Sequence, residues 1–145
     1  MSGIVVGVDG SHNASRALEW AMSEAATRNT QLTVLTVLSE PASYWTGLPV
    51  PYAGDAGRIA EIRKSAEAAV EATAAKLAGG KPAAVTVTAV AGFPAETLIQ
   101  ASKDCDMLVV GTRGGGGFGS LILGSVSNQV VHHASCPVVV VPAGN

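Results

Sequence analysis

Charged residues are scarce in this sequence, and those present show no excess of positive charge. Asp, Glu, Lys and Arg make up 14% of the 145 residues, and 9 basic against 11 acidic side chains give a formal net charge of −2. Nucleic-acid binding that ignores sequence needs a basic face, because it releases counterions from the phosphates. The composition therefore argues against a nucleic-acid-binding protein.

Long apolar runs are missing as well, although the mean hydropathy of +0.35 is high. The longest runs, such as Val138 to Val141, are far too short to span a bilayer. No basic segment precedes the first apolar residues, and Asp9 interrupts them, which favours a first strand over a signal peptide. We therefore expect a cytoplasmic protein that makes no contact with membranes.

Cysteine is nearly absent from the chain. The two cysteines, Cys105 and Cys136, do not form a CxxC pair. We interpret both as buried thiols that pack like small apolar residues. A disulfide between them is not expected in a reducing cytosol.

Aromatic side chains are few, with two each of Phe, Trp and Tyr, while the apolar fraction reaches 48%. An aliphatic surplus of this kind is typical of parallel strands buried on both faces. Short runs rich in Val, Ile and Leu predict five strands. The predicted strands are Ile4 to Val8, Leu32 to Leu38, Val85 to Val90, Met107 to Val110 and Val138 to Val141.

Helical periodicity fills the intervals between these strands. The helices are predicted over Ser11 to Arg28, Ile59 to Leu77, a short segment with Pro94 in its first turn, and Gly124-Ser125 to His133. Alternating strands and helices predict a parallel sheet with right-handed crossovers. We expect one α/β domain over residues 1–145, a Rossmann-like, doubly wound, five-stranded parallel sheet of order 3-2-1-4-5 with helices on both faces.

The expected strand order also predicts where a ligand binds. Strands 1 and 4 become neighbours at the topological switch point, and ligands occupy the crevice beyond the carboxyl ends of such strands. Functional residues are therefore expected just after Val8 and just after Val110.

Glycines are concentrated after the fourth predicted strand, where six of the nine residues from 111 to 119 are glycine. Such a segment lets backbone N–H groups surround an anion, and the helix start at Gly124 adds unpaired donors and a positive dipole end. Arg113 and the hydroxyls of Ser125 and Ser127 complete a predicted phosphate site. The alternative is a glycine hinge that binds no ligand.

Familiar catalytic and nucleotide motifs are absent. The chain has no Walker A sequence and no GxSxG elbow. A GxGxxG match from Gly114 to Gly119 follows the fourth strand instead of the first, and no acidic residue lies about twenty positions further on, which excludes a dinucleotide Rossmann site. Two well-placed carboxylates for acid–base chemistry are also missing, so a dedicated enzyme is not expected.

Several segments together match the pattern of one known family. They are VVGVDGS at 5–11, AGFPA at 91–95, LVVGTRG at 108–114, LGSVS at 123–127 and CPVVVVP at 136–142. With the spacing Gly111-x2-Gly114-x9-Gly124-Ser125, which is similar to a nucleotide-binding signature, the whole chain resembles the universal stress protein family. One departure is Gly115, where the family often has Arg or a similar residue, so one cation for the ligand is missing.

The resemblance implies an ATP-binding, stress-linked regulatory protein that is usually a homodimer. By position, these residues would hold the phosphates and ribose: Gly111, Arg113, Gly114, Gly124, Ser125, Val126 and Ser127. Asp9 would lie beside the nucleoside and Val37 would touch the base. The turn and loop residues Gly10, Ser11, Gly92 and Thr112 complete the candidate site. No metal site of the protein's own is expected, and Mg²⁺ accompanying ATP would lie near Asp9.

Other functions stay open at this point. Cyclic AMP needs fewer phosphate contacts than ATP, which suits the missing side chain at Gly115. A slow ATPase or phosphotransferase is a second alternative, and an interaction protein with a vestigial glycine loop is a third. The long connection 39–54, which contains Tyr44, Trp45 and Tyr52, is either a lid over the base or partner surface, or a mobile loop.

The remaining expectations concern the surface. Val138 to Val141 is an uncharged edge strand in the expected order, and we predict that two copies pair antiparallel through it into a twofold homodimer. His132 and His133 are interpreted as a surface pair near a helix C-terminus, because adjacent helical residues point about 100° apart and do not readily chelate one ion. Asp104 and Asp106 are interpreted as loop acids at the edge opposite the ligand crevice.

Overall fold

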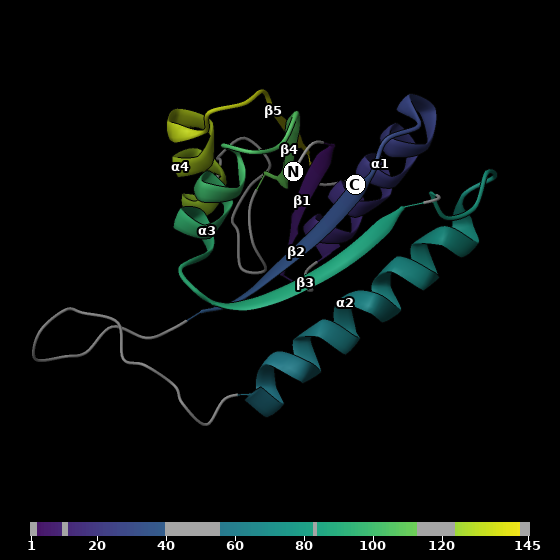
Figure 1. Ribbon diagram of the computed structural model, residues 1–145, viewed down its shortest axis with the longest axis horizontal. Helices are drawn as coiled ribbons and strands as arrows, with labels where there is room; N and C mark the ends of the chain where they lie inside the picture. The colour runs from purple at the N-terminus through teal and green to yellow at the C-terminus, as the bar shows by residue number, and fades with distance from the viewer. Residues whose placement is uncertain (1–2, 10–11, 40–55, 83, 113–123, 143–145) are drawn as a thin grey trace, which may run out of the picture.

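The computed structural model describes residues 3–9, 12–39, 56–82, 84–112 and 124–142 (Figure 1). Five strands form one parallel sheet in the order β3-β2-β1-β4-β5, which confirms the predicted topology. The strands are β1 (Ile4–Val8), β2 (Leu32–Ser39), β3 (Val85–Gly92), β4 (Met107–Gly111) and β5 (Val138–Val141). The helices are α1 (His12–Arg28), α2 (Ala56–Lys76), α3 (Pro94–Ala101) and α4 (Ser125–His133).

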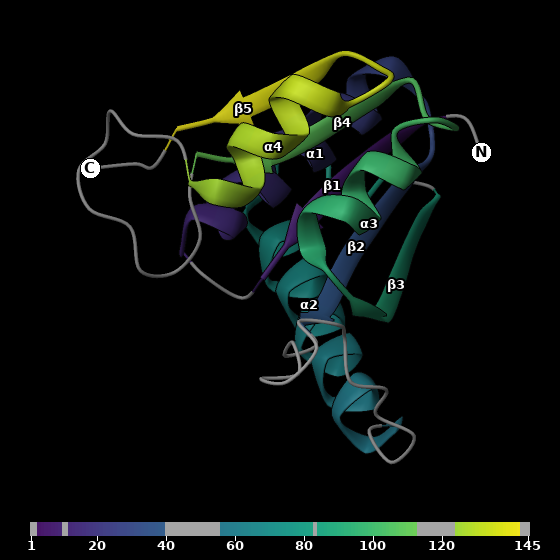
Figure 2. The same ribbon diagram turned by 90° about the vertical axis from the view of Figure 1, so that its left-hand side faces the viewer.

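The helices cover the two faces of the sheet in pairs. Helices α1 and α2 pack on one face, and α3 and α4 lie side by side on the other, which faces the viewer in Figure 2. Because strand side chains alternate, Val6 points into the α1–α2 layer while its neighbour Val5 points into the α3–α4 layer. None of the described helices is long and apolar enough to span a membrane.

Three strands extend beyond the apolar runs that predicted them. The last pairs between β2 and β3 are Leu38 with Ala91 and Ser39 with Gly92. Toward the other edge of the sheet, at the same carboxyl end, Gly111 pairs with Val141. Backbone hydrogen bonds continue the ladder past the last bulky side chain, so hydropathy alone placed these ends one or two residues early. The start of α1 at Ser11 lies outside the described residues, and the helix is described from His12.

An extra contact locks the amino end of the sheet. The carboxylate Oδ2 of Asp106 accepts a hydrogen bond from the backbone N–H of Gly3 at 2.8 Å, and the N–H of Asp106 donates to the carbonyl of Gly3 at 2.8 Å. Asp106 therefore ties the start of β1 to the start of β4. Its prediction as an ordinary loop acid missed this role, although its position opposite the ligand crevice is as expected.

The strands β1 and β4 separate toward their carboxyl ends. Their register pairs run from Ile4 with Met107 to Val6 with Val109, whereas β1 continues to Val8 and β4 to Gly111. The ends of β1 and β4 pair only with their outer neighbours, β2 and β5, and so leave room for a ligand between them at the switch point. The fold therefore has an opening where the sequence predicted the functional residues.

Candidate functional site

A cavity of about 290 Å³ lies at the carboxyl ends of β1, β2 and β4, where α3 and α4 begin. Its lining combines strand ends from the centre of the sheet with the first turns of the two helices on one face. The lining residues are Gly7, Val8, Asp9, Leu35, Val37, Ser39, Pro94, Leu98, Val110, Gly111, Ser125, Val126 and Ser127. Clefts at this place in doubly wound sheets are the usual ligand sites.

The polar wall of the cavity is the first turn of α4. The first hydrogen bond within this helix joins the N–H of Asn128 to the carbonyl of Gly124 at 2.9 Å, so the N–H groups of residues 125–127 have no acceptor inside the helix. These three residues line the cavity, and the helix dipole places partial positive charge beside them. The first turn contains no acidic residue, so the wall is suited to an anion.

Hydrogen bonds hold α4 against the end of β4. The carbonyl of Thr112 accepts from the N–H of Gly124 at 2.6 Å and from the Oγ of Ser127 at 2.8 Å. The Ser127 hydroxyl also lies 3.2 Å from the Gly124 carbonyl, and the residue is only 3% exposed. A hydroxyl has one proton to donate, so in this structure Ser127 orients the helix start and does not offer its proton to a ligand.

The opposite wall of the cavity is apolar. Leu35 and Leu98 are both buried, and Val37 lies between the strands and α3 on the same face. Gly7 allows α3 to come this close, because a Cβ at that position would lie 3.0 Å from both Leu98 methyl carbons. An apolar wall and a wall of backbone N–H donors in one cavity suit a ligand with a ring at one end and a negative charge at the other.

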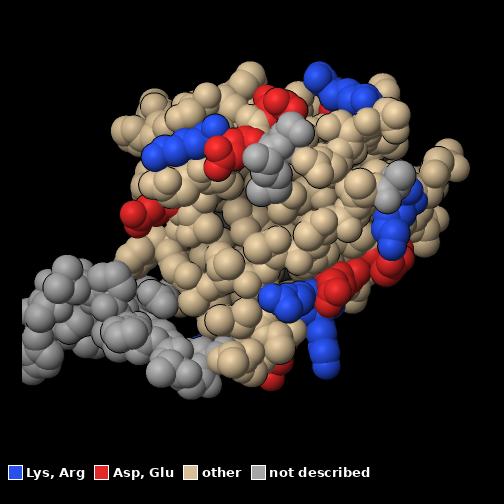
Figure 3. Space-filling view, in the orientation of Figure 1, with Lys and Arg blue, Asp and Glu red and all other residues tan. Residues whose placement is uncertain are grey.

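Charge near the cavity is sparse. Asp9 is exposed at the end of β1 and is the one ionisable side chain among the described lining residues. On the face shown in Figure 3, basic and acidic side chains lie beside each other and neither sign forms a large patch. Among the described residues, the features that suit an anion are therefore backbone donors and not a general positive field.

The structure places six of the predicted site residues on the cavity wall: Asp9, Val37, Gly111, Ser125, Val126 and Ser127. Four others, Gly10, Ser11, Arg113 and Gly114, lie outside the described residues, as does nearly all of the predicted lid segment 39–54. Gly92, Thr112 and Gly124 are described but do not line the cavity.

Each of those three residues lies within two positions of a lining residue in the chain. Thr112 is 8% exposed, its N–H donates to Val141 at 3.1 Å, and its Oγ1 has no hydrogen-bond partner among the described residues. Gly92 has φ +156° at the turn into α3, where a Cβ would lie 3.3 Å from the Thr97 hydroxyl. Gly124 is the N-cap of α4 and provides no side-chain cap.

Sequence reasoning missed the remaining seven lining residues, which are apolar except for Ser39. Those residues are Gly7, Val8, Leu35, Ser39, Pro94, Leu98 and Val110. Two simple periodicities would have found several of them. Leu35 and Ser39 share a face of β2 with Val37 through the two-residue strand repeat, and Leu98 follows Pro94 by one helical turn.

In the described parts of the chain, groups suited to metal binding are not gathered near the cavity. Among the described residues, no cluster of three or more His, Cys, Asp or Glu side chains is arranged to hold a metal ion. His132 and His133 are exposed at the far end of α4, with ring centroids 6.5 Å apart and an interplanar angle of 79°. This placement agrees with their interpretation as a surface pair.

Fold and cavity together define a doubly wound α/β protein with a ligand-sized opening at its switch point. Residues 1–142 match the model of the universal stress protein family. The chain therefore belongs to the universal stress protein family, which confirms the resemblance seen in the sequence.

Known relatives agree with this assignment. Universal stress protein Rv2005c of Mycobacterium tuberculosis is 33% identical over 139 residues, which cover 96% of this chain and 47% of that protein. The chain spans about half the length of the curated relatives it matches. UspA from Lactobacillus plantarum has a TM-score of 0.73 at 24% identity, with 97% of each chain covered, which shows the shared fold. A universal stress protein solved in complex with cAMP is 26% identical, with a TM-score of 0.66 over 99% of this chain and 98% of that one.

Proposed function

We propose that this protein is a cytoplasmic nucleotide-binding regulator whose ligand is ATP. The observation that carries the proposal is the meeting of two walls in one cavity of about 290 Å³, the first turn of α4 and the apolar surface of Leu35, Val37 and Leu98. Its volume is close to the lower end of the range for small-molecule sites. That a universal stress protein 26% identical was solved with cAMP supports a nucleotide as the ligand.

Each part of the nucleotide is proposed to bind a different region of the cavity. The phosphates bind the N–H groups of residues 125–127 together with Gly111, and Arg113, Gly114 and Gly124 extend this contact as the family resemblance implies. The base packs against Val37 and its apolar neighbours. The Asp9 carboxylate accepts hydrogen bonds from the ribose hydroxyls or holds Mg²⁺ that accompanies ATP, because a carboxylate facing phosphate directly would repel it.

Regulation, and not catalysis, is the proposed role. Hydrolysis of ATP requires a positioned water and a group that orients it. Asp9 is the one ionisable side chain among the described lining residues, so the described wall offers no second group for acid–base chemistry. Phosphate release above background that disappears in Asp9→Ala would favour the slow ATPase instead.

The test is calorimetric titration of the protein with ATP, cyclic AMP and adenosine. We expect ATP to bind with a Kd between about 1 µM and 1 mM, corresponding to about −8 to −4 kcal/mol. Val37→Phe fills the base side of the cavity and should abolish binding, while Val131→Phe on the exposed side of α4 should not. Equal ATP affinity in both variants would refute the cavity as the site.

Cyclic AMP is the second candidate ligand, favoured by the complex solved for a relative. It has one phosphate, so it uses only part of the anion-binding wall. Competition of ATP and cyclic AMP for one labelled nucleotide gives their ranking, and mass spectrometry of freshly purified protein identifies which nucleotide is carried along. A protein that binds neither nucleotide would be an interaction protein with a vestigial loop.

We further propose that residues 1–145 act as one domain and assemble into a twofold homodimer through β5. This strand ends the sheet order, and three of its four valines are only half-buried within one chain. An uncharged strand edge of this kind exposes unpaired backbone groups to a second copy. Light scattering should give twice the chain mass, and a stable monomer at high concentration would contradict the dimer.

A further inference from the structure

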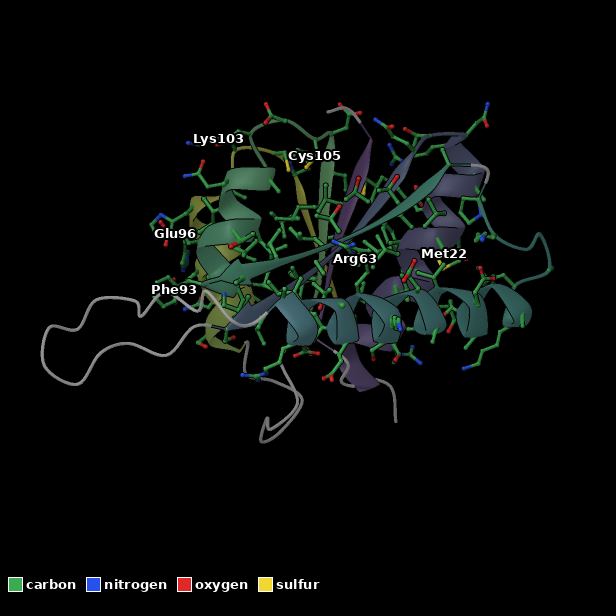
Figure 4. All side chains as sticks on the ribbon, turned by 60° about the horizontal axis from the view of Figure 1, so that its bottom comes forward. Met22, Arg63, Phe93, Glu96, Lys103 and Cys105 are labelled. Atoms are coloured by element: carbon green, nitrogen blue, oxygen red, sulfur yellow. The ribbon has the colours of Figure 1, made fainter. Side chains whose placement is uncertain are left out.

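Two thiols lie against each other at the end of the sheet opposite the cavity. Cys105 precedes β4 and Cys136 precedes β5, and their Sγ atoms are 3.7 Å apart. Figure 4 shows Cys105 at the far end of α3 from Phe93, which marks the cavity end of that helix. We propose that Cys105 and Cys136 are a peroxide-responsive dithiol that closes reversibly into an intramolecular disulfide.

The backbone brings the two cysteines into disulfide range. Leu108 and Val138 are register partners in adjacent parallel strands, and the N–H of Leu108 donates to the carbonyl of Pro137 at 3.0 Å. Counted back from this pair, Cys136 lies one residue out of register with Cys105, and the 3.7 Å between their Sγ atoms shows that the paired strands bring the two thiols into contact. Bond formation shortens the sulfur–sulfur distance from 3.7 Å to about 2.05 Å, a change within reach of side-chain rotation.

A buried serine fixes the segments on the other side of the pair. The Ser102 hydroxyl donates to the carbonyl of Ile99 at 2.6 Å and accepts from the N–H of Ser135 at 2.9 Å. It therefore joins the end of α3 to the residue before Cys136. With Pro137 held by Leu108, the cysteine segments are tied together on both sides, and the thiols stay in contact.

Cys105 and Cys136 differ in their surroundings, and this difference gives each thiol its own role in the reaction. Cys105 is 9% exposed, whereas Cys136 is only partly buried and is the sulfur that a dissolved oxidant reaches. Burial, followed by the hydrogen bond with Cys136, raises the pKa of Cys105 to about 12, so it remains a thiol at neutral pH. Cys136 is therefore the sulfur oxidised first, and Cys105 resolves the product.

The reaction balances with hydrogen peroxide as the two-electron oxidant. The Cys136 thiolate attacks one peroxide oxygen, the O–O bond breaks, and the sulfur becomes a sulfenic acid while the leaving hydroxide takes a proton to form water. The Cys105 sulfur then displaces hydroxide from that sulfenic acid as its own proton is lost, which forms the S–S bond and a second water. A thiol reductant reverses the step by disulfide exchange.

The ring closed by this disulfide contains elements that border the cavity. Residues 105–136 include β4, Thr112 and all of α4. Closing a ring of about 32 residues restricts the unfolded chain, and the expected rise in the midpoint of thermal unfolding is about 10 °C. The proposal does not depend on nucleotide binding and is tested without a nucleotide.

The test treats the folded protein with a small molar excess of hydrogen peroxide and maps the product. Trypsin cleaves after Lys103 and Arg113, and no Lys or Arg follows, so Cys105 lies in peptide 104–113 and Cys136 in peptide 114–145. We expect these peptides to appear linked, two hydrogens lighter than their sum, and to separate on reduction. The loss of both thiols per chain and the rise in unfolding temperature should follow the same time course.

Matched variants separate the two steps. Cys105→Ser should stop at a sulfenic acid on Cys136 that dimedone traps, and Cys136→Ser should leave Cys105 unreacted on the same time scale. Neither variant should gain thermal stability on oxidation. A mixture of isotopically light and heavy protein should give linked peptides of one isotope only, because both cysteines belong to one chain.

Three results would overturn the proposal. In the first, both wild-type thiols stay free after peroxide treatment, or Cys136 becomes a sulfinic acid and no linked peptides form. Either finding would show that Cys105 does not react with an oxidised Cys136. Linked peptides of mixed isotope would show a bond between chains. A rate of linkage no faster in the folded protein than in denaturant would show that the 3.7 Å contact does not promote the reaction.

Discussion

Replacing Ser125 with proline tests whether backbone amides bind the ligand. Ser125 is the first residue of α4, where proline is tolerated because its N–H has no acceptor within the helix. Gly124 already has φ −67° and ψ 166°, an extended conformation that the residue before proline requires. The same chain starts α3 with Pro94, so Ser125→Pro should keep the helix and remove one amide donor.

The size of the effect follows from the charge of the ligand. A hydrogen bond to a charged group contributes about 1.5–3 kcal/mol, so losing one amide–phosphate bond should raise the Kd for ATP about 10- to 100-fold. Ser125→Ala is the matched control, because it keeps the amide and removes only the hydroxyl. Both variants lack the hydroxyl, so the loss of affinity in Ser125→Pro beyond that in Ser125→Ala measures the contribution of the amide.

Calorimetry of the wild type and both variants, with unfolding temperature as a check on the fold, provides the measurement. Wild-type affinity in Ser125→Pro would refute the role of the amide wall. Equal losses in Ser125→Pro and Ser125→Ala would show that the hydroxyl is the contact and the amide is not. Either outcome would move the phosphates away from the start of α4.

Three further predictions concern stability, assembly and pH. Gly3→Ala should lower the free energy of unfolding, measured in urea, by about 2–4 kcal/mol. The reason is that Gly3 has φ +103° and that a new Cβ would lie 2.5 Å from the Gln31 carbonyl oxygen. A loss under about 1 kcal/mol would mean that the backbone relaxes around the new side chain. Val139→Lys should give monomers by light scattering with unchanged circular dichroism, and a persisting dimer would place the interface elsewhere. The pKa of Cys105 is about 12 in the folded protein and near 9.0 in the unfolded chain, so unfolding releases its proton between these pH values. Reduced wild-type protein should therefore lose stability from pH 9 to 12 more steeply than Cys105→Ala. Urea midpoints that fall in parallel for the two proteins would contradict this.

The strands were predictable because their signal is local. Ile4–Val8 and Val138–Val141 are uninterrupted enough for hydropathy alone to give both ends, and the helical segments between strands predict a parallel sheet. The end of β3 at Gly92 was missed because the pairing of Ser39 with Gly92 depends on a neighbouring strand. On α2, the buried residues are Ala66, Val70 and Thr73, and the packing of α1 against α2 decides that this side faces the sheet.

The two halves of the cavity differ in how far a sequence predicts them. The amide wall follows from strand order and from a helix start at Ser125, both of which leave a pattern in the chain. In the apolar wall, strand and helix repeats point to Leu35 and Leu98, but the close approach of Leu98 to Gly7, a contact between α3 and β1, leaves no pattern in the chain. For Thr112 the sequence suggested too much. Its place in a ligand-binding signature suggested a contact with the ligand, whereas its backbone hydrogen bonds join β4, β5 and α4. Position within a motif therefore predicts where a residue lies more reliably than which of its atoms faces the ligand.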